Sequence, residues 1–369
     1  MHKSSKQIEE MTGLYLSAAL SIIDAQDMAL ATRDFEKMLQ GLRRYFAYER
    51  PAFERKRNVV WEREGLRIYR YENRAGGQAK DGIFLVPSMI NGSEIMDLLP
   101  DYSFVNYLTA HGYDVYMGDW SGAYKTRDMA SLNCVIAALA EAFRGMVSDF
   151  PGQHLHGFGY CMGGLLLLGA VSQLTKKERP KTLAFLATPW RFDLESDTLS
   201  HYLRASYGAS QAHFRDHDVA PFSWMQPIFI ALDPHSPLKK FAGFTEMQDG
   251  SDEANRFVAI EDWVNSGPPL ATQFISDCME SWYGQDGTPN GRWRIGDRLF
   301  HAKDIDIPAF VCSPVKDRLV PHESAMALAA ELPQATSFEP DCGHIAAMVG
   351  SRAKTLLWQP YLDWLQSHL

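Results

Sequence analysis

The chain has 369 residues, 46% of them hydrophobic and 22% charged, which is typical of a globular protein with a large buried core. Its formal net charge of −9, with no basic stripe to offset it, argues against nucleic acid or an anionic membrane surface as a partner. The five cysteines are widely scattered and form no C-x-x-C pair, a pattern that fits neither a disulfide framework nor a zinc site and predicts reduced thiols in the cytoplasm.

The N-terminal region has helical periodicity. Apolar residues recur at helical spacing between residues 5 and 55, which predicts two helices, and we expect residues 1–55 to pack on the core. The first residues lack a cleavage signature, so we read them as a helix and not as a signal peptide. The longest apolar run, residues 165–171, is far too short for a transmembrane segment.

From residue 57 onward the pattern changes to strands that alternate with helices. Residues 57–71 alternate between apolar and polar and predict a hairpin, and residues 82–87 form a short apolar run bounded by glycine and proline. Further strands are expected at 114–118, 153–158, 182–187, 307–313 and near 336, and helices at 103–110, 128–150, from 161 onward, at 323–332 and at 353–365, the last with a kink at Pro360. This order predicts an α/β fold with a mostly parallel, doubly wound sheet.

The alternation stops between residues 189 and 266, where aromatic residues and prolines are frequent. We interpret this stretch as an inserted cap. The predicted core then comprises residues 56–188 and 267–369.

Residues 159–164 read GYCMGG and lie between a predicted strand and a predicted helix. This is the spacing of the G-x-S-x-G nucleophile elbow of α/β hydrolases, with Cys161 in place of serine. The nucleophile of an elbow occupies a strained turn, and glycines let the strand and the helix approach each other. The helix N-terminus favours a thiolate electrostatically. The alternative is a structural turn that holds a buried cysteine.

Two later residues complete a catalytic triad on this interpretation. Asp317 follows the strand that ends at residue 313, and His344 follows the last predicted strand. The order of Cys161, Asp317 and His344 is that of nucleophile, acid and base in α/β hydrolases. A surface Asp in an ion pair and a His that caps a helix remain the alternatives for the latter two.

Backbone N–H groups near the elbow are the candidates for an oxyanion hole. Met162 directly follows Cys161, and Ser88 or Met89 lies in the loop after the first core strand. An ordinary strand-to-helix turn is the alternative for that loop.

The other histidines and cysteines give weaker signals. His154 and His156 precede the elbow and lack a third ligand at metal spacing, so we expect them to support the core and not to bind metal. No metal or cofactor is predicted. We expect Cys134, Cys278 and Cys312 to be buried thiols, and Cys342 lacks an elbow.

With these motifs, the chain resembles the polyhydroxyalkanoate synthases, nearest the short type that works with a second subunit. The resemblance rests on VPSMIN (86–91), GYDVYMGDW (112–120), the cysteine box GYCMGG, KDRLVP (316–321) and GHI (343–345), and it covers roughly residues 80–350. The sequence departs from the family at Gly92, where arginine is usual, and across the cap.

The resemblance implies that Cys161 carries the growing acyl chain and that His344 and Asp317 serve as bases, Asp317 either orienting His344 or acting separately. It also implies a 3-hydroxyacyl-CoA thioester as substrate, a second copy of the chain or a second synthase subunit as partner, and a cytoplasmic location at polyester granules. A thioesterase or a polyhydroxyalkanoate depolymerase with the same triad is the main alternative, and a non-catalytic granule scaffold is another.

Overall fold

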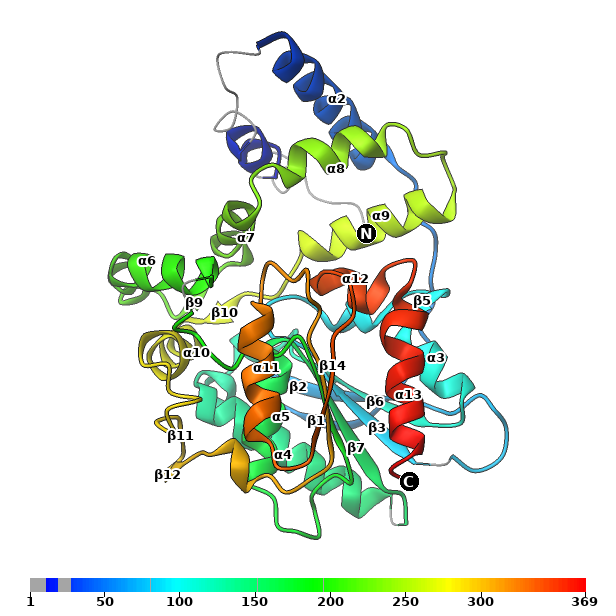
Figure 1. Cartoon of the computed structure of the whole chain (residues 1–369), viewed down its shortest axis with the longest axis vertical. Helices are drawn as coiled ribbons and strands as arrows, with labels where there is room; N and C mark the ends of the chain where they lie inside the picture. Colours follow the sequence, from blue (N-terminus) through cyan, green and yellow to red (C-terminus); the bar gives the residue numbers. More distant parts are fainter. Residues whose placement is uncertain (1–10, 19–27, 80, 151, 195) are drawn as a thin grey trace. The chain divides into compact units, whose positions relative to one another are not determined.

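The computed structural model describes residues 11–18, 28–79, 81–150, 152–194 and 196–369. Its chain trace is shown in Figure 1. The chain divides into two compact units. Unit 1 comprises Met1–Glu54 and Phe222–Ser266, and unit 2 comprises Arg55–Pro221 and Gly267–Leu369.

Unit 2 is built on an eight-stranded sheet. Strands β1 and β2 form the predicted hairpin and pair antiparallel with each other, β2 pairs antiparallel with β6, and the other neighbours are parallel. The mostly parallel α/β sheet expected from the sequence is therefore confirmed. The strand order is β1 (Asn58–Arg63), β2 (Leu66–Tyr71), β6 (Asp114–Asp119), β3 (Gly82–Val86), β7 (Leu155–Tyr160), β8 (Leu183–Leu186), β13 (Ala309–Cys312), β14 (Ala335–Phe338).

The central strands are short apolar runs because both of their faces are covered. Every residue of β3, β7, β8 and β13 is buried, whereas β14 at the sheet edge is partly exposed. Such strands have no polar face to alternate with an apolar one. The carboxyl ends of β6, β3, β7, β8 and β13 meet at one edge of the sheet, which we call the carboxyl edge, and their opposite ends meet at the amino edge.

The helices of the predicted pattern are present, with shifted ends. Helix α4 begins at residue 132 and not at 128, because the hydroxyl of Ser131 accepts a hydrogen bond from the Cys134 N–H and caps the helix there. At the C-terminus a π-helical turn, Lys354–Trp358, precedes Pro360. The helices of this pattern are α3 (Phe104–Ala110), α4 (Leu132–Asp149), α5 (Met162–Ser172), α11 (His322–Glu331) and α13 (Gln359–Gln366), and α12 (His344–Val349) is a further helix that the pattern did not predict.

The stretch between β8 and β13 contains helices that the sequence pattern did not resolve. In unit 2 it holds α6 (Thr198–Phe214), the paired strands β9 (Val219–Ala220) and β10 (Leu270–Ala271), α10 (Thr272–Cys278) and a π-helix η6 (Met279–Gly284). Residues 189–221 of the predicted cap therefore belong to unit 2, and residues 222–266 belong to unit 1. The cap itself stays a prediction.

Unit 1 is a helical assembly. Helix α2 (Met28–Ala47) packs against α8 (Ser236–Phe244), and α7 (Gln226–Leu232) and α9 (Asp252–Val264) belong to the same unit. Its core includes Tyr45 and Phe241, whose rings meet edge to face. Residues 11–18 are helical, as expected. That the N-terminal helices pack on the sheet core stays a prediction.

Within the described ranges, no helix combines the length and the apolar character that a membrane crossing requires.

Candidate active site

Cys161 occupies the turn between β7 and α5, at the carboxyl edge of the sheet. Its backbone angles are φ 54° and ψ −128°, a strained conformation for a residue other than glycine. The turn is held by the Cys161 N–H, which donates to the Leu186 carbonyl at 2.8 Å, and by the Gly164 N–H, which donates to the Cys161 carbonyl at 2.9 Å. The side chain is half-buried. This is the geometry of a nucleophile elbow.

The three glycines of the cysteine box are needed for packing. A Cβ on Gly159 would clash with the backbone of Gly164, and a Cβ on Gly163 would clash with the carbonyls of Val86 and Pro87. A Cβ on Gly164 would strike the Thr188 side chain. The sequence thus places glycine where β7, α5 and the loops after β3 and β8 approach most closely.

His344 and Asp317 meet beside the elbow. The His344 Nδ1 lies 2.6 Å from the Asp317 Oδ2, and the two side chains are only 10% and 1% exposed. The other carboxylate oxygen of Asp317 accepts hydrogen bonds from the N–H groups of Leu319 and Val320. Asp317 is therefore fixed on both oxygens, and its contact with Nδ1 leaves the other ring nitrogen of His344 available to the Cys161 side chain, which lies near enough to raise the pKa of His344.

The charge state of His344 follows from these neighbours. Burial by itself lowers the pKa of His344, but the Asp317 carboxylate and Cys161 outweigh it and raise this pKa to about 10. An imidazole in this environment holds its proton at neutral pH. A protonated imidazole next to Cys161 stabilises a thiolate.

The candidate oxyanion donors lie on both sides of the elbow. Met162 is the first residue of α5, and the first N–H groups of a helix have no acceptor within it. Ser88 and Met89 follow β3, where the Ser88 hydroxyl accepts from the Ile90 N–H at 3.2 Å. The Trp120 indole donates to the Pro87 carbonyl at 3.2 Å and holds the same loop. The oxyanion role of these residues stays a proposal.

The remaining predicted residues lie elsewhere. His156 is fully buried between Thr182 and Asp81 at the amino edge, at 2.8 Å from the Thr182 Oγ1 and 3.4 Å from the Asp81 Oδ2, whereas His154 is exposed. Only His156 is thus a core residue. Of the thiols expected to be buried, Cys278 and Cys312 are buried and Cys134 is half-buried.

Two tyrosines near the site were missed by sequence reasoning. The Tyr160 ring lies 5.1 Å from the His344 ring, and its buried hydroxyl has no hydrogen-bond partner among the described residues. Burial raises the pKa of Tyr283 well above its ordinary value, and Cys161 lies near enough to raise it further. Tyr160 adjoins the elbow and could have been noticed. Tyr283 lies in a π-helix, which no pattern in the sequence signals.

The part of the chain that the structure describes contains no group of three or more His, Cys, Asp or Glu side chains that could hold a metal ion.

A model of the alpha/beta hydrolase family matches residues 83–356. A similar solved structure is that of a highly thermostable carboxyl esterase from Bacillus coagulans, with a TM-score of 0.54 at 12% identity, covering 85% of this chain and 98% of that one. At this identity the likeness shows the fold alone.

Similar proteins include the poly(3-hydroxyalkanoate) polymerase subunit PhaC of Haloferax mediterranei, 24% identical over 310 residues, which are 83% of this chain and 63% of that protein. The chain thus spans slightly less than two thirds of this relative. The same subunit of Thiocystis violacea is 24% identical over 84% of this chain and 87% of its own length, and that of Synechocystis sp. is 22% identical over 90% and 91%. The resemblance to polyhydroxyalkanoate synthases is confirmed.

Proposed function

The chain belongs to the alpha/beta hydrolase family, and from this premise we propose that it is an acyltransferase that polymerises 3-hydroxyacyl-CoA into polyhydroxyalkanoate through an acyl group carried by Cys161. The names of the PhaC relatives support the polymerase activity. The observation that carries the proposal is the contact of His344 with Asp317 beside Cys161, where the cysteine occupies a strained elbow and lies near enough to raise the pKa of His344.

In the first half-reaction the Cys161 thiolate attacks the thioester carbonyl carbon, and a new C–S bond forms. The N–H of Met162 and one from Ser88 or Met89 donate hydrogen bonds to the developing oxyanion, and each good donor is worth about 3 kcal/mol. The tetrahedral intermediate collapses, the bond to the CoA sulfur breaks, and the leaving thiolate takes the proton from His344. Exchange of one thioester for another is close to energetically neutral, which favours cysteine over serine as the carrier.

In the second half-reaction the hydroxyl of another 3-hydroxyacyl group attacks the carbonyl of the acyl-cysteine. Neutral His344 takes the hydroxyl proton, an ester C–O bond forms, and Cys161 leaves as a thiolate beside the imidazolium. The 2.6 Å contact to Nδ1 favours Asp317 as the residue that orients His344, and direct deprotonation of the hydroxyl by Asp317 is the alternative role.

The test is an assay of the purified chain and of a Cys161→Ala variant with 3-hydroxybutyryl-CoA, which follows CoA release and separates polymer from free acid. Polymer that depends on Cys161 is the expected result. Free 3-hydroxy acid as the sole product would replace the transferase with a thioesterase that uses the same three residues, because water would then reach the acyl-enzyme.

A homodimer or a second synthase subunit, and association with polyester granules in the cytoplasm, belong to this proposal. Both follow from the resemblance to the synthases. Gel filtration of the chain alone and after mixing with a candidate second subunit tests the first.

A further inference from the structure

Tyr160 is the last residue of β7 and directly precedes Cys161 in the chain. Its strand lies inside the sheet, because β7 pairs with β3 on one side and with β8 on the other. The side chain is only 1% exposed. An aromatic ring that is buried on a central strand has little freedom to move. Tyr160 is therefore a rigid support for any group that its ring contacts.

The Tyr160 ring contacts His344. The two ring centroids lie 5.1 Å apart and the ring planes are tilted by 32°, closer to parallel than to perpendicular. The imidazole thus has the Asp317 carboxylate at Nδ1 and an aromatic ring beside it. The face of an aromatic ring is electron-rich and attracts a cation within about 6 Å of the ring centroid. The contact therefore favours the imidazolium form of His344 over the neutral form.

The hydroxyl of Tyr160 takes no part in this contact. It is buried and makes no hydrogen bond within the described ranges. Burial raises the pKa of Tyr160 well above its ordinary value, and Cys161 and Asp317 raise it further, so the hydroxyl keeps its proton and the ring stays neutral. A buried hydroxyl without a partner destabilises a fold. The ring, and not the hydroxyl, is what this position contributes to the site.

The other ionisable groups around His344 are exposed or neutral. Burial raises the pKa of the Cys342 thiol, two residues before His344, and keeps it uncharged. The charged side chains on elements that pack against α12 and on the neighbouring loops are exposed: Glu94 of η2 (Ser93–Met96), Lys354 of η8 (Lys354–Trp358), Lys316, Arg318, Asp341 and Arg352. The buried groups that act on His344 are therefore Asp317, Cys161 and the Tyr160 ring.

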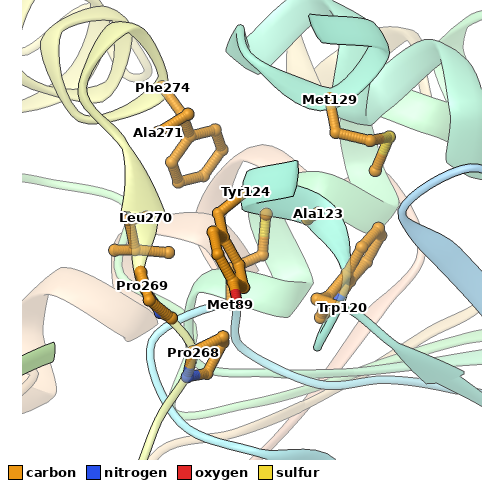
Figure 2. A pocket seen from close by; sticks show the side chains of 10 residues that line it. All are labelled: Met89, Trp120, Ala123, Tyr124, Met129, Pro268, Pro269, Leu270, Ala271 and Phe274. Atoms are coloured by element: carbon orange, nitrogen blue, oxygen red, sulfur yellow. The ribbon is translucent and has the colours of Figure 1, made fainter. Parts of the chain in front are cut away.

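The loop after β3 brings no charge to the elbow. Gly163 packs on the backbone of this loop, and the loop borders the narrow pocket that Figure 2 shows between Met89 and Phe274. The pocket has no room for a water-sized group, and its described lining residues include no Asp, Glu, Lys, Arg or His. This loop therefore supports the elbow through packing, whereas Tyr160 contacts the histidine itself.

We propose that Tyr160 is a positioning residue: the face of its ring holds the His344 imidazole beside Asp317 and Cys161 and favours its protonated form. The imidazolium in turn stabilises the Cys161 thiolate before a substrate binds. The inference rests on the proposed function, which makes Cys161 the nucleophile. It assigns the residue before the nucleophile a role in the charge of the site.

The test follows the rate at which iodoacetamide alkylates Cys161 across pH, measured by mass spectrometry on the full chain. Tyr160→Leu removes the ring, so the pair of imidazolium and thiolate forms at higher pH. The midpoint of the alkylation profile should rise by about half to one pH unit, which is about three- to tenfold in the equilibrium between the pair and the neutral groups. In CoA release from 3-hydroxybutyryl-CoA, kcat should fall about tenfold and KM should stay within about twofold, because His344 is displaced and no substrate contact is lost.

Tyr160→Phe keeps the ring and should restore both the alkylation midpoint and kcat to those of the unaltered chain. Replacement of Tyr160 by pentafluorophenylalanine keeps an aromatic ring but reverses the charge of its face, so the midpoint should rise as in Tyr160→Leu. This variant also serves if Tyr160→Leu does not fold. Tyr361→Leu is the matched control: Tyr361 is also buried and its hydroxyl also lacks a partner among the described residues, but its ring packs on Phe104 and Phe158. It should lower the unfolding midpoint and leave the alkylation midpoint unchanged.

An alkylation midpoint that pentafluorophenylalanine does not move would overturn the proposal. A loss of kcat in Tyr160→Phe as large as in Tyr160→Leu would also overturn it, because the hydroxyl would then carry the role. The expected shifts without CoA release from the unaltered chain would support the role of Tyr160 and refute the polymerase. CoA release with alkylation midpoints that no Tyr160 variant moves would overturn the role of Tyr160 and leave the polymerase standing.

Discussion

The two edges of the sheet in unit 2 each hold a histidine beside an aspartate, and the difference between them shows what makes such a pair chemically useful. At the carboxyl edge His344 contacts Asp317 through one ring nitrogen, and Cys161 lies near enough to raise the pKa of His344. At the amino edge both ring nitrogens of His156 are taken, one by Thr182 and one by Asp81.

The partner of the second ring nitrogen therefore decides what each histidine can do. His156 has no nucleophile to serve, and it is fully buried among residues that precede or begin strands. His344 begins α12 next to a strained cysteine. The same two residue types tie strands together at one edge and, on the proposed function, transfer a proton at the other.

The largest expected effect comes from removal of the proposed nucleophile, because the histidine at the carboxyl edge then has no cysteine beside it, like the histidine at the amino edge. Cys161→Ala should reduce CoA release at least ~10³-fold, because no other group near His344 replaces the thiolate. Cys342→Ala is the matched control: it is also a free cysteine, close in sequence to His344, and should keep activity within a few-fold. Mass spectrometry after brief iodoacetamide treatment should find Cys161 labelled first, and equal labelling of the five cysteines would argue against an activated thiol.

Replacement of each of the two histidines by glutamine, one at a time, should separate an effect on activity from an effect on stability. His344→Gln should reduce kcat about 10³-fold, because it removes the proton carrier. His156→Gln should keep kcat per folded molecule but destabilise the fold by about 1–3 kcal/mol, since it disturbs hydrogen bonds of buried groups. Urea unfolding and CoA release, measured on both variants, test this. Equal loss of kcat in both would contradict the division of roles.

Replacement of Asp317 should affect activity, whereas replacement of Asp81 should affect stability. Asp317→Asn should reduce kcat by up to ~10⁴-fold, because an amide no longer holds the Nδ1–H tautomer of His344. Asp81→Asn should act on the unfolding midpoint and not on kcat. If Asp317→Asn changes only the unfolding midpoint, the ion pair of His344 is structural.

The smallest effects concern pH, where the two pairs respond in opposite directions. The pKa of His344 is raised to about 10 in the fold, so its contribution to stability is fully present below its ordinary value near 6.5 and is lost as pH rises toward 10. Burial alone would raise the pKa of Asp81, but the hydrogen bond from His156 and that from the His154 N–H lower it below its ordinary value, so its contribution is lost only as acid protonates it.

Unfolding midpoints across pH for the unaltered chain, His344→Gln and Asp81→Asn would show this. The unfolding midpoint of His344→Gln should approach that of the unaltered chain at alkaline pH. The unfolding midpoint of Asp81→Asn should approach it at acid pH. Gaps that are constant across pH would indicate that neither pair changes protonation on unfolding.

The site was more predictable than its surroundings for a physical reason. An elbow needs glycines at fixed local spacing, and Gly159, Gly163 and Gly164 carry that requirement in six residues. The order of Cys161, Asp317 and His344 follows from the strand order. Local chemistry and topology are both visible in a sequence.

Contacts between distant segments were not visible. Nothing near Tyr283 signals that a π-helix brings it toward Cys161, and nothing near Phe274 signals a pocket shared with Met89. The grouping of residues 1–54 with 222–266 likewise arises from packing between helices far apart in the chain, such as α2 on α8. Periodicity predicts that a helix has an apolar face but does not identify the helix it meets.

The backbone conformation of Cys161 has a consequence for selection between stability and activity. A residue other than glycine in such a conformation stores about 1–3 kcal/mol, which the surrounding hydrogen bonds must outweigh. Cys161→Gly, which accepts a φ of 54° without strain, should melt at a higher temperature than Cys161→Ala although both are inactive. A screen of random variants for heat resistance alone would then favour variants that have lost Cys161. A thermostable version of this chain therefore has to be selected for turnover at the same time.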